Sequence, residues 1–131
     1  MIKGVGVDII EIERIRKAVN RRKSFVERFF NQGEISRGVE NKAYYQEIAS
    51  KFAAKEAVAK AMGTGFRGFS WKDIHIINDH LGKPMVKLEG AADEISADLG
   101  INSFLLSITH TDQYAVACAI AVSNSDRREK F

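Results

Sequence analysis

The sequence has few of the features that mark secreted or membrane proteins. It contains one cysteine, Cys118, which excludes an intrachain disulfide and indicates a cytoplasmic protein. Its longest apolar run, residues 114–122, is far shorter than the roughly 20 residues of a membrane-spanning helix. The N-terminal segment is broken by glycines and an aspartate, so it does not have the pattern of a secretory signal peptide. We therefore expect a cytoplasmic protein without a membrane partner.

The sequence also lacks the common motifs of nucleotide, nucleic-acid and soft-metal sites. Its glycines form neither a Walker loop nor a dinucleotide-binding fingerprint. No zinc finger, RNP motif or KH-type loop accompanies the basic residues, so a nucleic-acid partner is the weaker expectation. A soft-metal site is disfavoured, because Cys118 stands alone and the three histidines are scattered.

What is present is the composition of one soluble globular domain. The chain has 131 residues, of which 45% are hydrophobic and 28% are charged. A net charge of +3 and a pI of about 9.1 suit an acidic partner protein, a phosphate-rich small molecule or nucleic acid.

Hydrophobic periodicity predicts an α+β order of elements. Helices are expected to begin near residues 11–13 and to cover 25–32, 42–62 and 91–99; strands are expected at 2–10, 71–77, 85–88, 103–109 and 114–122. The long helix should have one apolar stripe, formed by Tyr45, Ile48, Phe52 and Ala59, and Gly63 should end it. The order predicts a single α+β domain with a mostly antiparallel sheet, packed against the long helix, and a polar tail at 123–131.

Asp8 is the unusual residue of the first strand, which is otherwise glycine and aliphatic until Glu11. One explanation is an N-cap for the following helix, although Asp8 lies one to three residues early for that role. The other is a ligand for a hard cation such as Mg²⁺, which one or two carboxylates hold together with substrate phosphates. Gly6 should allow another backbone to approach this face of the strand closely.

Glu56 and Lys60 on the long helix are four residues apart. This spacing most often gives a surface ion pair worth about 0.2–0.5 kcal/mol. The alternative is a carboxylate for a metal and an ammonium for a phosphate, one helical turn apart, with Asp8 and Glu56 as the metal ligands.

Two further features carry open alternatives. His110 ends the stretch SFLLSITH (103–110) and is either a turn histidine or a donor to a phosphate. The first helix carries a basic stripe, which is either a solvated face or a docking surface for an acidic partner helix. Its members are Arg14, Lys17, Arg21 and Arg22.

Four blocks of sequence together resemble those of the holo-[acyl-carrier-protein] synthases, which belong to the 4′-phosphopantetheinyl transferase superfamily. The blocks are GVGVDIIEIERI (4–15), FAAKEAVAKAMGTG (52–65), INDHLGKP (77–84) and LLSITHTDQYAVACAI (105–120). The resemblance covers residues 1–122, which would form the transferase domain and leave 123–131 as the tail. Its most specific part is the aspartate combined with the F-x-x-K-E-A-x-x-K-A run. Thr109 stands where many relatives carry serine, a mild departure that keeps the hydroxyl.

The resemblance implies transfer of 4′-phosphopantetheine from coenzyme A to a serine of apo-acyl carrier protein, in fatty acid biosynthesis. Mg²⁺ would be held by Asp8, Glu56 and the coenzyme A pyrophosphate, and Lys60 would neutralise the leaving adenosine 3′,5′-bisphosphate. Either Glu56 or a metal-bound water near Asp8 would take the serine proton, and the water is favoured because a carboxylate that binds the metal is a poor base.

The resemblance also implies which residues bind the substrates. Coenzyme A would contact His110 and Lys60, with Gly63, Gly65, Pro84 and Thr111 around it. The acidic helix of the carrier protein would dock on Arg14, Arg21 and Arg22. Short members of the family form homotrimers with active sites at subunit interfaces, where Asp8 and Glu56 come from one chain and part of the pocket from the next. The alternative is a non-catalytic α+β module that binds an acidic protein or RNA through its basic helix.

Overall fold

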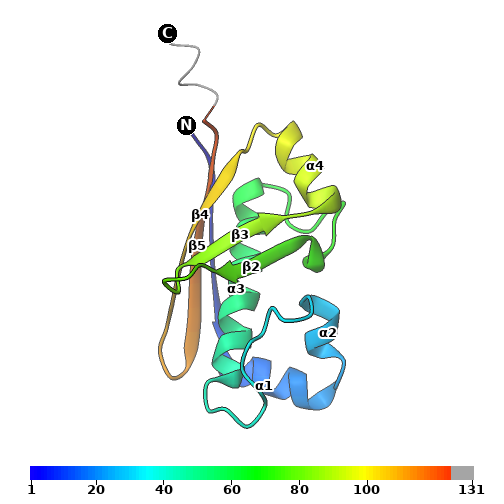
Figure 1. The fold of residues 1–131 in the computed structure, drawn as a ribbon, viewed down its shortest axis with the longest axis vertical. Coiled ribbons are helices and arrows are strands. Elements are labelled where there is room, and N and C mark those ends of the chain that lie inside the picture. Colours follow the sequence, from blue (N-terminus) through cyan, green and yellow to red (C-terminus); the bar gives the residue numbers. More distant parts are fainter. Residues whose placement is uncertain (125–131) are drawn as a thin grey trace.

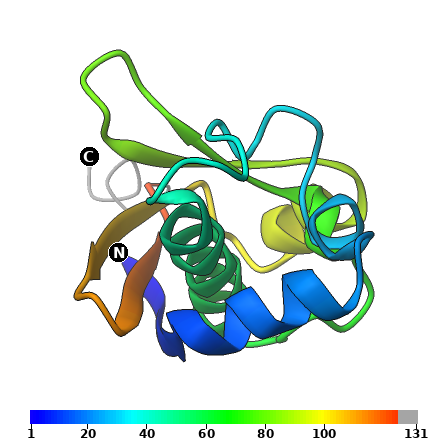
Figure 2. The ribbon, with the colours of Figure 1, turned by 90° about the horizontal axis from the view of Figure 1, so that it is seen from below.

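One long helix forms the centre of the molecule, and the other elements pack around it (Figures 1 and 2). The structure is a computed structural model that describes residues 1–124 of the chain. In chain order the elements are β1 (Ile2–Glu11), α1 (Ile12–Arg21), α2 (Phe25–Phe29), α3 (Tyr44–Met62), the 3₁₀ turn η1 (Trp71–Asp73), β2 (Ile74–Asn78), β3 (Pro84–Leu88), α4 (Gly90–Asp98), β4 (Ser103–His110) and β5 (Tyr114–Val122).

The strands form two antiparallel sheets. β1, β5 and β4 form a three-stranded sheet in that order, and β2 pairs with β3 in a separate hairpin. In the larger sheet Ala117 of β5 lies between Asp8 of β1 and Ile108 of β4. The predicted α+β class is confirmed. β4 and β5 form an antiparallel hairpin, and β1 and β4 are the two edges of the larger sheet.

Small residues let α3 lie directly on this sheet. A Cβ atom added to Gly6 would come within 2.0 Å of the carbonyl oxygen of Ala57, and one added to Gly4 within 2.0 Å of that of Ala61. The residues of β5 that face α3 are all alanines: Ala115, Ala117, Ala119 and Ala121. The close approach predicted at Gly6 is confirmed, and the approaching backbone is that of α3.

The burial of α3 differs from the single apolar stripe that its sequence predicts. Neighbouring elements surround the helix (Figure 2), so polar as well as apolar residues along it are buried. Lys55 is fully buried and pairs with the buried carboxylate of Glu34 at 3.0 Å. The four residues of the predicted stripe do pack in the core. The prediction was incomplete because periodicity identifies one apolar face, whereas this helix has partners on almost every side.

Three predicted boundaries also need correction. Residues 71–73 form η1 instead of the first part of a strand, because the Trp71 ring stacks on Phe52 and Phe66 at centroid distances of 4.6 and 4.0 Å. The helix expected at 25–32 ends at Phe29. Arg22 follows the last residue of α1, in extended backbone, so it does not continue the helical basic stripe.

Residues 123 and 124 bond to the body of the molecule. The backbone N–H of Ser123 donates to the carbonyl oxygen of Met1 at 2.8 Å, and the Asn124 N–H donates to the side chain of Asn102. The remainder of the expected polar tail, 125–131, lies outside the described residues. Within 1–124, no helix is both long enough and apolar enough to span a membrane.

Candidate active site

Asp8, Glu56 and Lys60 come together where the edge strand β1 crosses α3. The ammonium of Lys60 donates to Oδ1 of Asp8 at 3.1 Å and to the carbonyl oxygen of Val7 at 3.0 Å. The ion pair of Lys60 is thus with Asp8, which is distant in sequence, and not with Glu56 on its own helix. Asp8 is also not an N-cap, because Glu11 holds that position for α1 and makes no side-chain cap bond.

The cluster contains more negative charge than positive charge. Burial raises the pKa of Glu56, and the nearby charge of Asp8 raises it further, while Lys60 opposes the shift. The Lys60 side chain is 50% exposed and that of Asp8 is 16% exposed, so the site opens to solvent on the lysine side. Two carboxylates with one ammonium leave negative charge unbalanced, and a further cation could balance it.

The donor set of this cluster fits Mg²⁺. Both candidate ligands, Asp8 and Glu56, offer hard carboxylate oxygens. Within residues 1–124 there is no group of three or more His, Cys, Asp or Glu residues that could enclose a metal by itself. Water and substrate phosphate would have to complete the coordination, which is how Mg²⁺ is usually bound by proteins.

His110 and Thr111 lie at the opposite edge of the sheet, at the end of β4, and Pro84 of β3 lies beside them, around two adjoining cavities. A cavity of about 320 Å³ is lined by His110 and Thr111, and one of about 220 Å³ by His110 and Pro84. The hydroxyl of Thr111 accepts the backbone N–H groups of Gln113 and Tyr114, at 3.2 and 3.0 Å, and so shapes the hairpin turn.

Gly63 and Gly65 lie at the C-terminal end of α3, away from these cavities. Both have positive φ, 82° and 60°, and Gly63 donates its N–H to the carbonyl oxygen of Lys60 at 2.9 Å. The predicted role of Gly63 in ending the helix is confirmed. Their predicted contact with substrate stays a prediction.

Within one chain the carboxylate cluster and the two cavities are separated. Asp8 on β1 and Ile108 on β4 lie on opposite edges of the sheet, two strand spacings or about 10 Å apart. On α3, Glu56 is rotated by about 120° from Ser50, which lines the smaller cavity. The two groups therefore face different sides of the molecule.

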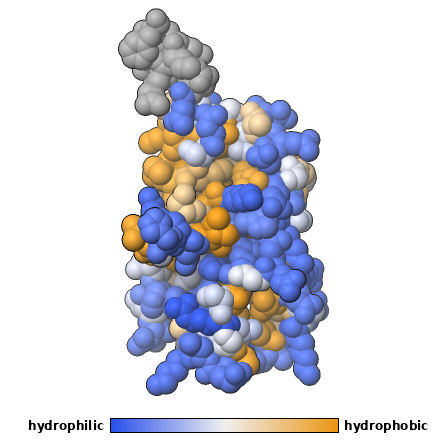
Figure 3. Space-filling view, viewed as in Figure 1, coloured by the Kyte–Doolittle hydropathy of each residue, from blue (hydrophilic) through white to orange (hydrophobic). Residues whose placement is uncertain are grey.

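The basic residues of α1 are exposed at the end of the molecule that appears at the bottom of Figure 1. Figure 3 shows mostly hydrophilic surface over this end, interrupted by small hydrophobic patches, and more continuous hydrophobic surface higher up. Arg16, which the sequence did not single out, forms a bidentate pair with Glu13. Arg14, Lys17 and Arg21 are exposed beside that pair.

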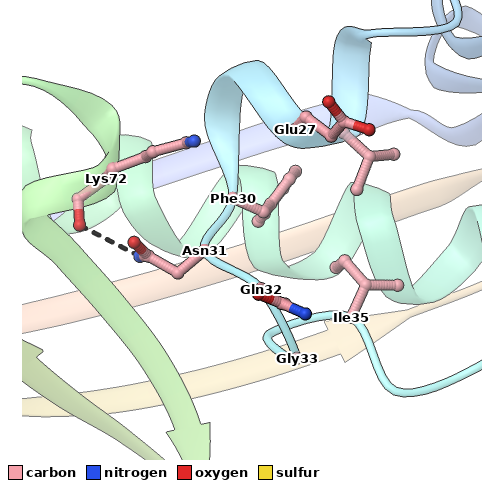
Figure 4. A pocket seen from close by; sticks show the side chains of 8 residues that line it. Glu27, Phe30, Asn31, Gln32, Gly33, Ile35 and Lys72 are labelled. Carbon is pink, nitrogen blue, oxygen red and sulfur yellow. Dashed lines mark hydrogen bonds between the residues drawn. The ribbon is translucent and has the colours of Figure 1, made fainter.

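A larger cavity, of about 440 Å³, contains none of the predicted site residues (Figure 4). It lies between α2 and η1, where the side-chain amide of Asn31 donates to the carbonyl oxygen of Lys72 at 3.0 Å. Glu27 and Lys72 give it one charge of each sign. Its size alone does not make it the functional site.

Comparison with known proteins identifies the family of the chain. A family model described as the 4′-phosphopantetheinyl transferase superfamily matches residues 4–119. The chain belongs to this superfamily. The resemblance to its holo-[acyl-carrier-protein] synthases, which the four sequence blocks predicted, is confirmed by individual relatives.

Three relatives illustrate the match. A holo-[acyl-carrier-protein] synthase of Clostridium acetobutylicum is 51% identical over 120 residues, which are 92% of this chain and 97% of the relative. The crystal structure of the synthase from Neisseria meningitidis has a TM-score of 0.85 at 33% identity, with 94% of this chain and all of that one covered. The synthase of Helicobacter pylori in complex with coenzyme A has a TM-score of 0.78 at 35% identity and covers 90% of this chain and 99% of that one.

Proposed function

We propose that the protein transfers the 4′-phosphopantetheine group of coenzyme A to a serine of apo-acyl carrier protein, as a step of fatty acid biosynthesis. The products are holo-acyl carrier protein and adenosine 3′,5′-bisphosphate. The observation that carries the proposal is the cluster of Asp8, Glu56 and Lys60, which matches the requirements of a pyrophosphate-bearing substrate. The names of the relatives, one of them in complex with coenzyme A, support it.

Mg²⁺ is the proposed cofactor, held by Asp8 and Glu56. When bound, it would neutralise and polarise the pyrophosphate oxygens. Lys60 is the mobile cation of the site, because its half-exposed ammonium can turn from Asp8 toward a phosphate oxygen. The proposal assigns it the charge that develops on the leaving bisphosphate.

In the transfer, the serine oxygen attacks the phosphorus next to the pantetheine, and the bond from that phosphorus to the bridging oxygen breaks. The serine proton needs an acceptor. Glu56 and a water beside Asp8 are the two candidates, and the water is favoured because a carboxylate that binds the metal is a poor base. The chain contributes mainly positioning and charge stabilisation.

The carrier protein is proposed to dock on α1. Arg14 and Arg21 are exposed there, with Arg22 just past the end of the helix. An acidic helix approaching this surface would be steered by long-range attraction, and its association would weaken as salt rises. A non-catalytic module that binds an acidic protein or RNA would also use this helix, but it would leave the charge excess at Asp8 and Glu56 without a purpose.

The proposal includes a homotrimer with active sites at subunit interfaces. The face of the sheet turned away from α3 is apolar, and Val5, Val7 and Ile9 on it are 56–60% exposed. In Figure 2 the described helices all lie on the other side of this sheet. Because the carboxylates and the His110 cavities occupy opposite edges, a neighbouring copy could join its β4 edge to this β1 edge and complete a site, and such head-to-tail contacts close into rings.

A mass measurement tests the transfer. The protein is incubated with coenzyme A, Mg²⁺ and apo-acyl carrier protein, and the carrier is weighed by mass spectrometry. We expect the mass to rise by one phosphopantetheine, and an unchanged mass would contradict the proposed function.

The proposed homotrimer is tested separately. Light scattering at micromolar concentration should give the mass of three chains. The reaction is placed in the cytoplasm, in line with a single cysteine that has no partner for an intrachain disulfide.

A further inference from the structure

One buried ammonium, that of Lys55, takes no part in the proposed transfer. This side chain is fully buried on α3 and is next in sequence to Glu56. Its ammonium donates to Oε1 of Glu34 at 3.0 Å and to the carbonyl oxygens of Phe29 and Trp71 at 2.9 and 3.1 Å. These three bonds use all three donors of an ammonium, so none is left for a ligand.

The three acceptors belong to three different segments of the chain. Phe29 is the last residue of α2, Trp71 is the first residue of η1, and Glu34 lies between α2 and α3. Glu34 is itself held in place, because its carboxylate accepts the backbone N–H groups of Asn31 and Ile76 at 2.9 and 2.8 Å. The buried ammonium is therefore tied to three fixed points.

Two further buried charges lie on the same side of α3 as Lys55. Glu47 and Lys51 precede it by eight and four residues, and their side chains are 5% and 10% exposed. Lys51 donates to the carbonyl oxygen of Glu34 and lies 3.1 Å from the Glu47 carboxylate. Glu47 in turn accepts the backbone N–H of Arg37 at 3.0 Å and lies 3.5 Å from its guanidinium. The segment that carries Glu34 is thus bonded to α3 at three successive turns of the helix.

The contact of α3 with β1 restrains the helix in a different way. Glu56 is turned by about 100° from Lys55 around the helix axis and belongs to the cluster with Asp8. On that side α3 lies directly on the backbone of β1, with no room for a Cβ atom at Gly6. In Figure 2 the larger sheet and α2 lie on different sides of α3. Small residues set the distance between strand and helix, but they offer few ridges that would resist a turn of the helix about its axis.

We propose that Lys55 is a positioning residue for the transfer reaction, because its three bonds fix the rotation of α3 and thereby the place of Glu56 opposite Asp8. This role rests on the proposed function. A side chain ends about 6 Å from the helix axis, so a turn of about 10° would move the Glu56 carboxylate by about 1 Å. Misplacement on that scale can cost a reaction about 10²-fold. Lys55 acts through this geometry and touches no substrate.

Two variants separate positioning from stability. Lys55→Met leaves the Glu34 carboxylate buried without its cation and should lower the urea midpoint strongly. The double variant Lys55→Met/Glu34→Gln removes both charges and should recover much of that loss, because no buried ion is left unpaired. We expect the kcat of the double variant to stay at least about tenfold below that of the wild type, with the KM for the carrier protein unchanged. Recovery of kcat together with stability would overturn the proposal.

Ile48→Ala is the matched control for loosened packing. Ile48 is fully buried on α3, two turns before Glu56, and makes none of the bonds of Lys55. Its truncation should lower the urea midpoint through the cavity that it leaves. We expect its kcat to stay close to that of the wild type. A loss of kcat equal to that of the double variant would show that any loosening of α3 slows the reaction, and the specific role of Lys55 would be overturned.

Metal binding in the absence of substrates gives a readout that does not depend on transfer. Mn²⁺ is titrated into the wild type, the double variant and Ile48→Ala, and free Mn²⁺ is followed by electron paramagnetic resonance. Binding to the double variant that is about tenfold weaker than to the other two supports the role of Lys55 even if transfer is absent. A wild type that transfers phosphopantetheine, with a double variant that binds Mn²⁺ and turns over equally well, retains the proposed function and loses the role of Lys55.

Discussion

Neighbouring residues of α3 belong to two very different clusters of charged side chains. Lys55 points into the molecule, where it donates to Glu34 at 3.0 Å and to the carbonyl oxygens of Phe29 and Trp71 at 2.9 and 3.1 Å. Glu56 belongs to the half-open cluster at β1, where two carboxylates share one ammonium. The first cluster is balanced and closed, and the second has an excess of charge and an opening to solvent.

This difference in charge balance and exposure indicates a structural role for the cluster of Lys55 and Glu34 and a binding role for the cluster at β1. The Glu34 carboxylate also accepts the backbone N–H groups of Asn31 and Ile76, at 2.9 and 2.8 Å, so the closed cluster joins the segment after α2, the long helix and the β2–β3 hairpin. A saturated network of this kind has no capacity for a ligand. The cluster at β1 has that capacity because its charges are unmatched.

The largest expected effect is on the closed cluster. Lys55→Met leaves the Glu34 carboxylate buried without its cation, and breaking a buried pair in this way costs about 3–5 kcal/mol of unfolding free energy. Urea denaturation measures the change. The matched variant Lys60→Met, five residues further along the same helix but half-exposed, should cost no more than about 1 kcal/mol. Equal losses in the two variants would contradict the distinction between the clusters.

The reverse pattern is expected for catalysis. Asp8→Ala and Glu56→Ala should each lower the rate of transfer by at least about 10²–10³-fold, because each removes a ligand of the proposed Mg²⁺, while the melting temperature changes little. The rate is measured by the mass-shift assay and melting by calorimetry. Near-normal rates in either variant at low Mg²⁺ would show that the metal assignment is wrong.

A smaller effect is expected at the exposed surface of α1. Arg14→Glu reverses a charge on the proposed docking surface and should raise the KM for the carrier protein about tenfold, with more effect at low salt. The KM for coenzyme A should not change. Lys87→Glu, an equal reversal at an exposed position of β3, serves as the control. An unchanged carrier KM in Arg14→Glu would argue against docking on α1.

The smallest expected effect concerns the buried carboxylate that holds Arg37. The pKa of Glu47 is lowered to about 2 from an ordinary value of 4.5. A lowered pKa stabilises the folded state above the unfolded pKa, and this contribution is lost as the pH falls from about 4.5 toward 2. Melting temperatures measured across that range should therefore fall more for the wild type than for Glu47→Gln. Parallel curves would show that Glu47 does not contribute to acid sensitivity.

The sequence predicted the open cluster better than the closed one, for a physical reason. Asp8, Glu56 and Lys60 stand out because each is a charge within an apolar pattern or at a recognisable spacing, and a resemblance connected them. Lys55 and Glu34 stand 21 residues apart in chain order, and nothing local indicates that both are buried. Their partnership follows only when the segment after α2 folds back over α3.

The dependence on partners that are distant in sequence also explains the other differences between the predicted and the observed structure. The end of α3 at Gly63 and the hairpin turn at Thr111 are local events, and residue types alone predict them. The 3₁₀ turn at Trp71 depends on stacking against aromatic rings from other elements, so strand propensity gave the wrong structure there. The anchoring of Arg37 could not be predicted from sequence, because Glu47 lies on another element and makes no recognisable motif with it.

The glycines of β1 act as a spacer for chemistry in which they take no part. Because Gly6 has no side chain, Asp8 can lie close enough to α3 for its charge to affect Glu56. Any side chain at Gly6 would have to push the strand from the helix by about 1 Å or more, and misplacement on that scale can cost a reaction about 10²-fold. An engineer who wished to change the metal preference of the proposed Mg²⁺ site could therefore vary the gap between strand and helix and leave both proposed ligands in place.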